Sequence, residues 1–243
     1  MSKSVVMAGW DDVPHLSEEA KAEMLEATPP HLRNSRSKGI PGLGAGAVYS
    51  VAENEITYDV SSLQIPTWYR RAYAMDVGWN ATAVVFGAFD TEQDTWYIYD
   101  GFKRGKCEPE IHASAIRKRY PGGMKLLGAI DPAAKGRSQI DGKNLLKMYC
   151  KDEGLRLVPA DNAVESGIQE VWSRLSTGRL KIASHLVAWF DEYRIYSRRE
   201  DGKIKKEHDH YMDATRYLIT TGASIAKPLQ TKKIVNADGR RYF

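Results

Sequence analysis

Apolar positions along residues 72–102 come in three short runs that predict β-strands. The first run is AYAMDV at 72–77, and it is followed by ATAVVFGAF at 81–89 and TWYIYDGF at 95–102. The second and third runs are rich in β-branched and aromatic residues, and the turn-forming sequence DTEQD separates them. We therefore predict one strand followed by two strands that form a hairpin.

After residue 107 the pattern changes to elements of helical and strand-like spacing in alternation. Ile111, Ala115 and Ile116 recur on one helix face within 108–120, whereas KLLGAID at 125–131 is a compact apolar strand. The pattern also predicts helices at 141–153, 162–176 and 208–221, a strand at 155–159, and a hairpin at 192–207 around an Asp-Gly turn. This order implies an α/β fold, a mixed sheet flanked by helices. A ribonuclease H-like fold has this order of elements.

The charge is distributed unevenly along the 243 residues, whose net charge is +4. Residues 1–66 hold five Lys/Arg and nine Asp/Glu, a net of −4, and residues 67–243 hold 30 and 22, a net of +8. The acidic part is also poorer in regular pattern: it predicts a short helix capped by Ser17 and then loops. We predict a joining segment at 1–66 and a main domain at 67–243.

Three aspartates stand where a sheet of this order brings side chains together. Asp76 lies in the first strand, Asp131 ends the fourth, and Asp213 lies on the last helix with Asp209 one turn earlier. Three converging carboxylates repel one another unless cations neutralise them, and oxygen ligands favour Mg²⁺ or Mn²⁺. Two such ions about 4 Å apart can hydrolyse a phosphodiester. The alternative is that these acids act as turn residues, pair with Arg216 or face water.

Two histidines near the last aspartate indicate less. His208 and His210 are two residues apart, so on a helix they point in different directions and a shared metal ion is not expected. We expect both side chains to be solvated.

Basic residues cluster around the predicted acidic site. Lys135 and Arg137 follow Asp131 directly, and the predicted hairpin carries Arg198, Arg199, Lys203 and Lys205. A nuclease needs such cations to hold phosphates that its own carboxylates repel, so we expect contacts with the backbone of double-stranded DNA.

Other classes of protein are excluded or disfavoured. No apolar run is long enough to cross a membrane, no secretion signal opens the chain, and two cysteines cannot form a disulfide framework. We expect a soluble intracellular protein without a membrane partner. A phosphate loop of the form G-x-x-x-x-G-K-[ST] is absent.

Three alternatives to a nuclease of this kind stay open. Residues 76–82, DVGWNAT, fit the D-x-G-x-x-x-T phosphate turn of ATP-binding domains of the actin and sugar-kinase type, although no second copy is present. The chain could also be a non-catalytic DNA-binding assembly module of the same fold, but it retains all three aspartates. A Holliday-junction resolvase or integrase relative is a third reading within this fold.

The chain resembles the C-terminal nuclease part of the large terminase subunit of tailed bacteriophages. AMDVGWN, GAIDPAAKGRS and DHYMDATRY resemble the three acidic motifs of that family, and WDDVPHL through AGAVYSV resembles the segment that joins its ATPase to its nuclease. The resemblance assigns Asp76, Asp131 and Asp213, and less directly Asp209, as metal-binding residues.

The resemblance also implies an activity and partners. It implies an endonuclease that cuts concatemeric viral DNA in the bacterial cytoplasm, with little sequence preference. The implied partners are a packaging ATPase domain, a portal and a small terminase subunit. Because the chain has no ATPase motif, we expect a fragment, an expressed domain or a split gene product.

Overall fold

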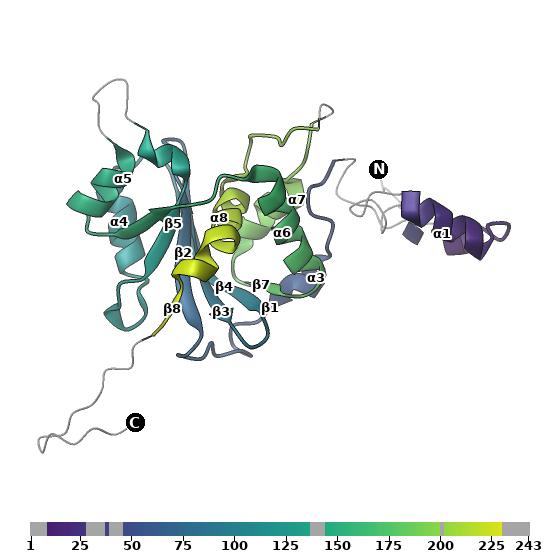
Figure 1. Ribbon diagram of the computed structural model, residues 1–243, viewed down its shortest axis with the longest axis horizontal. Helices are drawn as coiled ribbons and strands as arrows, with labels where there is room; N and C mark the ends of the chain where they lie inside the picture. The colour runs from purple at the N-terminus through teal and green to yellow at the C-terminus, as the bar shows by residue number, and fades with distance from the viewer. Residues whose placement is uncertain (1–8, 28–36, 39–45, 137–143, 200–201, 230–243) are drawn as a thin grey trace, which may run out of the picture. The chain divides into compact units, whose positions relative to one another are not determined.

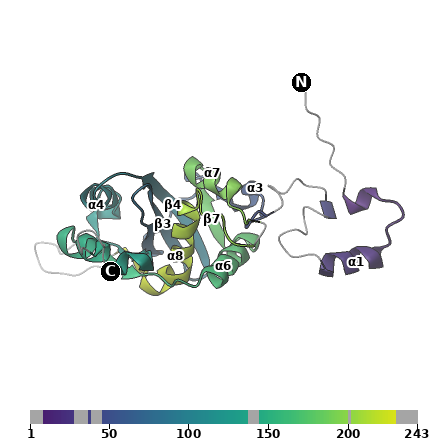
Figure 2. The same cartoon turned by 90° about the horizontal axis from the view of Figure 1, so that it is seen from above.

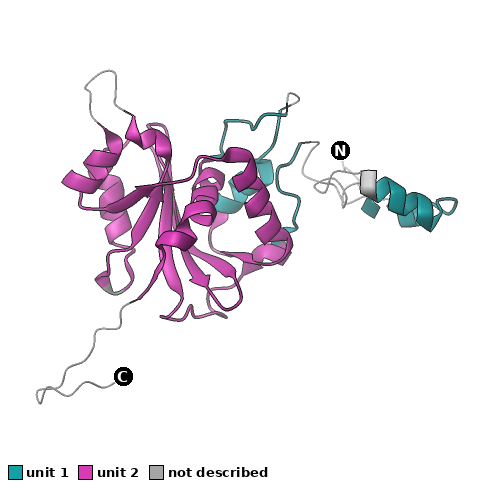
Figure 3. Ribbon diagram, viewed as in Figure 1, with its two compact units in different colours: residues 1–53, 188–209 teal, residues 54–187, 210–243 magenta. Residues whose placement is uncertain are grey.

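The computed structural model describes residues 9–27, 37–38, 46–136, 144–199 and 202–229. The chain forms two compact units, shown in different colours in Figure 3. The smaller unit contains residues 1–53 and 188–209, and the larger unit contains residues 54–187 and 210–243. The boundary at residues 66/67, which rests on composition and charge, stays a prediction.

The larger unit is built on a mixed sheet, in which the described residues form eight strands (Figure 1). The strand order is β1-β7-β4-β3-β2-β5-β6, and β8 pairs separately with β2. Strands β2, β3 and β4 are antiparallel neighbours, whereas β5 is parallel to β2, β6 to β5, and β7 to β4. This confirms the predicted α/β class. The strands are β1 (Thr57–Tyr58), β2 (Arg70–Asp76), β3 (Thr82–Asp90), β4 (Thr95–Arg104), β5 (Leu127–Ile130), β6 (Arg156–Pro159), β7 (Leu180–Ala183) and β8 (Lys227–Pro228).

Helices cover both faces of this sheet. Figures 1 and 2 place α4 on one side, and α8 with α6 on the other. In the described part of the chain, no helix has both the length and the apolar character to cross a membrane. The α-helices are α1 (Glu18–Ala27), α3 (Glu53–Ile56), α4 (Pro109–Arg117), α5 (Leu145–Lys147), α6 (Val164–Ser176), α7 (Val187–Ile195) and α8 (His210–Ile225). The short helices are η1 (Trp10–Asp12), η2 (Pro121–Gly123), η3 (Pro132–Lys135) and the π-turn η4 (Met148–Asp152).

Alternation along β2 divides its side chains between the two faces. Tyr73 and Met75 belong to the apolar cluster that also holds Ile116 of α4, so they point to that side. The residues between them point to the opposite side, where α8 packs against β2, β3 and β5. On the α8 side the sheet is closely approached: a Cβ on Gly87 would lie 2.6 Å from the Leu218 side chain. Glycine is needed there for α8 to pack.

Several predicted elements need correction. The hairpin predicted at 192–207 is wrong over 192–195, which is the end of α7. Further along it is confirmed, because Arg198 pairs antiparallel with Ile204 and the Lys205 N–H donates to the Ser197 carbonyl at 2.9 Å. The alternating apolar residues also fit a helix, because Tyr193 stacks on Trp189 one turn earlier, with ring centroids 5.2 Å apart. The strand β7 was not predicted. The last helix runs three residues past the predicted stop at Gly222.

The smaller unit confirms the predicted start of the first helix. The Ala20 N–H donates to Ser17 Oγ at 3.2 Å, and α1 begins at Glu18. Pro29 and Pro30, which follow this helix in the sequence, lie outside the described residues, as does the predicted beginning of the helix at 141–153. In the described part of that helix, α5 and η4 confirm the prediction.

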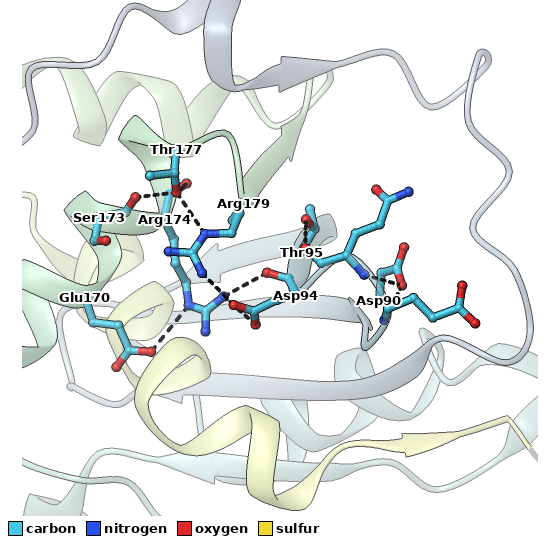
Figure 4. A network of polar contacts seen from close by, with 10 residues as sticks. Asp90, Asp94, Thr95, Glu170, Ser173, Arg174, Thr177 and Arg179 are labelled. Atoms are coloured by element: carbon cyan, nitrogen blue, oxygen red, sulfur yellow. Dashed lines mark hydrogen bonds and ion pairs between the residues drawn. The ribbon is translucent and has the colours of Figure 1, made fainter.

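An ion-pair network ties the β3–β4 turn to α6 and β7 (Figure 4). The Asp94 carboxylate accepts from Arg174 Nη1 at 3.1 Å and from Arg179 Nη1 at 2.6 Å. Arg174 also reaches Glu170 at 3.3 Å. Asp94 itself has a positive φ of 48°, a conformation that Asp and Asn tolerate better than most residues.

Substituting Asp94→Asn is expected to lower the free energy of unfolding by about 1 kcal/mol. Asparagine keeps the backbone conformation but loses the charge that holds two arginines, and such half-exposed pairs are worth little individually. Urea denaturation followed by circular dichroism measures the effect. Glu92→Ala, an exposed acid on the same turn, is the matched control and should leave the midpoint unchanged.

Candidate active site

The register of two parallel strands brings Asp76 and Asp131 side by side. Met75 of β2 pairs with Ile130 of β5, so the next residue on each strand lies at the same edge of the sheet. The Asp131 N–H continues the ladder by donating to the Met75 carbonyl at 3.0 Å. One Asp131 carboxylate oxygen accepts from the Ala133 N–H at 2.9 Å and caps η3. The two predicted acids are therefore neighbours because of the backbone.

Asp76 points to the face of the sheet that α8 covers. It follows Met75, which lies in the cluster on the opposite face. Its Oδ2 lies 2.8 Å from Nδ1 of His210, the first residue of α8. The residue is 9% exposed. The His210 side chain is 30% exposed, and the prediction that it is solvated is wrong, because the helix begins directly opposite the end of β2.

Asp213 follows His210 by about one turn of α8 and is also buried. Its Oδ1 accepts from Nη2 of Arg216 at 2.9 Å, and the Arg216 side chain is only 2% exposed. Gly167 of α6 leaves room for this arginine: a Cβ there would lie 2.8 Å from Arg216 Cγ. The pairing with Arg216 that was the alternative for Asp213 is therefore present.

The charges of the three aspartates affect the pKa values of neighbouring groups. Burial raises the pKa of Asp76 above its ordinary value, and the negative charges of Asp213 and Asp131 raise it further, while the hydrogen bond from His210 opposes them. Burial likewise raises the pKa of Tyr217, and the charges of Asp131, Asp213 and Asp76 act in the same direction. A cation placed among the three carboxylates would relieve this repulsion.

The donor set fits hard divalent cations. Three carboxylates supply only oxygen, which Mg²⁺ and Mn²⁺ prefer. The residues are not arranged as a closed site, however: within the described ranges, no three His, Cys, Asp or Glu side chains converge on one point. Asp76 and Asp213 are instead held by His210 and Arg216, so binding a metal requires these two carboxylates to turn.

The remaining predicted site residues are placed less closely or not at all. Asp209 is 6% exposed and precedes α8 in the smaller unit, where Lys206 Nζ lies 3.2 Å from its Oδ2. Lys135 ends η3, four residues after Asp131, and is exposed. Arg137 lies outside the described residues. Arg198, Arg199, Lys203 and Lys205 belong to the smaller unit. Their roles stay predictions.

The chain is similar to known proteins of one family. The family model described as terminase RNase H-like domain matches residues 73–221, which include all three aspartates. The large terminase subunit of Salmonella phage P22 is 29% identical over 224 residues, covering 89% of this chain and 44% of that protein. The chain thus spans less than half the length of this relative.

Solved structures share the fold. The nuclease domain of the P22 large terminase superposes with a TM-score of 0.67 at 26% identity, covering 77% of this chain and 97% of that domain. The ribonuclease H-like prediction is therefore confirmed. The nuclease domain of the phage SPP1 large terminase, solved with bound Mn, has a TM-score of 0.51 at 15% identity, covering 72% of this chain and 99% of that one. The phage G20c nuclease is similar in fold and was solved with cobalt and with magnesium.

Proposed function

Because this chain belongs to the terminase RNase H-like domain family, we propose that it is a metal-dependent DNA endonuclease that cleaves concatemeric viral DNA during genome packaging. The observation that supports the proposal is the position of Asp76 beside Asp131 at one edge of the sheet, where the negative charges of Asp213 and Asp131 both raise the pKa of Asp76. The family match favours this function over the ATP-binding alternative drawn from residues 76–82.

Each aspartate has a distinct part in the proposed site. Asp76 would hold two Mg²⁺ or Mn²⁺ ions, and Asp131 and Asp213 would hold one each. When bound, such ions activate a water and stabilise the leaving oxygen of a phosphodiester. In the metal-free chain, Asp76 is hydrogen-bonded to His210 at 2.8 Å and Asp213 to Arg216 at 2.9 Å.

The substrate and partners follow from the family and the charge. Lys135 and Arg137 would contact DNA phosphates beside Asp131, and Arg198, Arg199, Lys203 and Lys205 would do so from the smaller unit. We propose that the chain works in the host cytoplasm with a packaging ATPase domain, a portal and a small terminase subunit. The greater length of the P22 relative is consistent with further parts of such a machine.

The proposal is tested by incubating supercoiled plasmid DNA with the protein and either Mn²⁺ or Mg²⁺. We expect nicked and linear products with metal and none in excess EDTA, because the three carboxylates provide no nucleophile of their own. Gel electrophoresis over a series of times measures the rate. Cleavage that persists in EDTA would contradict the two-ion mechanism.

A second readout separates the alternatives. DNA binding that is retained without any cleavage in either metal would favour the non-catalytic assembly module. Tight ATP binding without cleavage would favour the actin and sugar-kinase reading of residues 76–82. Cleavage of plasmids with unrelated sequences tests the expected lack of sequence preference.

A further inference from the structure

The larger unit contains a cavity whose charged lining residues, within the described part of the chain, are all basic. It has a volume of about 300 Å³ and lies among the ends of β2, β5, β6 and β8. Its charged lining residues are Arg71, Lys125, Arg156 and Lys227. Among the described residues, no acidic side chain lines it. Four cations around one hollow repel one another unless an anion lies between them.

The cavity is separate from the aspartate site in two respects. Arg71 lies near the start of β2 and Asp76 at its end, five residues or about 17 Å further along the strand. Arg71 lies two residues before Tyr73 and four before Met75, so on a strand it shares their face of the sheet, the α4 side. Asp76 points to the α8 side. An anion in this cavity therefore cannot be the phosphate that the aspartates would cleave.

Arg71 is the feature that distinguishes this cavity from an ordinary basic surface. The residue is only 7% exposed, although an arginine side chain carries a full positive charge. One Nη donates to the carbonyls of Ile65 and Pro66 at 3.1 and 3.3 Å, and the guanidinium lies 5.1 Å from the centroid of the Tyr99 ring. Its Nε is buried without a hydrogen-bond partner among the described residues. Among the described residues no carboxylate pairs with Arg71, so its guanidinium, which lines the cavity, is suited to an oxyanion bound there.

We propose that this cavity is a binding site for a phosphate group. Arg71 would provide the buried, fixed donor, while Lys125, Arg156 and Lys227 are exposed and would close around the remaining oxygens. The volume exceeds that of several waters, so a phosphate fits with part of its hydration or with the sugar that carries it. The phosphate could come from a small phosphorylated molecule or from the backbone of a DNA segment outside the cleavage site. The inference does not depend on the nuclease function proposed above.

The test uses the full chain and inorganic phosphate as the probe. Two-dimensional NMR at constant ionic strength, balanced with chloride, should show saturable shifts of the Arg71, Leu126 and Leu127 amides. Lys227→Gln and Arg156→Gln should each weaken phosphate binding about tenfold, since each removes one charge-assisted contact. Lys151→Gln, an exposed lysine that does not line the cavity, is the charge-matched control and should leave the affinity unchanged.

A second arm identifies the source of the phosphate. Binding of a 20-base-pair duplex is measured in EDTA by fluorescence anisotropy over a range of salt concentrations. If DNA supplies the phosphate, Lys227→Gln reduces the slope of log affinity against log salt by about 1, and Lys151→Gln does not. If the slope is unchanged while inorganic phosphate still binds, a small phosphorylated ligand is the source. Phosphate shifts that fail to saturate, or that are equal in all three variants, would overturn the proposal.

Discussion

Substituting Asp76→Asn is expected to reduce metal-dependent DNA cleavage at least about 100-fold, because it removes the carboxylate that both proposed ions share. The same variant should be more stable than the parent protein in EDTA. Burial and the neighbouring acids raise the pKa of Asp76, so its ionised form costs folding energy that asparagine does not. Plasmid cleavage measures the first effect and thermal unfolding the second.

The sign of the stability effect can be checked with pH. A carboxyl whose pKa is raised by folding stabilises the protein at low pH, and this contribution is lost as pH rises through the folded-state pKa. The gain in Tm for Asp76→Asn in EDTA should therefore be larger at pH 8 than at pH 4. Added Mn²⁺ should raise the Tm of the parent but not that of the variant. Asp152→Asn, an exposed acid, serves as the control for both assays. Equal cleavage by the parent and Asp76→Asn would refute the assigned site.

Substituting Arg216→Met is expected to lower the free energy of unfolding by about 3–5 kcal/mol in the absence of metal. The change leaves the Asp213 carboxylate buried without its cationic partner, which costs more than the pair itself is worth. For a chain of this size the loss corresponds to a fall in Tm of roughly 10 °C. Differential scanning calorimetry in EDTA measures it.

A second substitution distinguishes an unpaired charge from simple loss of packing. Asp213→Asn combined with Arg216→Met removes the charge as well as its partner, so most of the lost stability should return. Mn²⁺ should likewise protect the Arg216→Met variant more than the double variant, because the ion then takes the place of the guanidinium. If the double variant is as unstable as Arg216→Met, packing against Gly167 and not charge accounts for the loss.

The fold was predictable where the chain has long, regular pattern. The strands at 72–77, 81–89 and 95–102 and the helices at 162–176 and 208–221 correspond to β2, β3, β4, α6 and α8 within a few residues. Two elements were missed. LKIA in β7 was not predicted as a strand. The apolar residues of EYRIY at 192–196 fit both the two-residue period of a strand and the 3.6-residue period of a helix. In that second segment the packing of Tyr193 on Trp189 decides for the helix.

The aspartates of the candidate site could be predicted from the sequence, but the contacts of His210 and Arg216 with them could not. Asp76 and Asp131 follow apolar strands, and their position at a common edge depends only on strand order. His210 could not be assigned, because its place opposite Asp76 depends on where α8 begins and how it crosses the sheet. From the sequence, pairing with Arg216 was only an alternative to metal binding for Asp213. Because Arg216 is buried, the pair is a feature of the site.

The pairing of β2 with β5 has a consequence for how such a site can change. The separation of Asp76 and Asp131 is set by the distance between hydrogen-bonded strands, about 4.8 Å, which is close to the spacing of two catalytic ions. This distance is a property of the main chain and hardly responds to side-chain substitution. Asp213 is different, because α8 is positioned by packing, including the contact of Leu218 at Gly87. We therefore expect substitutions under α8 to move Asp213 relative to Asp76 and Asp131, and so to change the metal preference of the proposed site without altering the sheet.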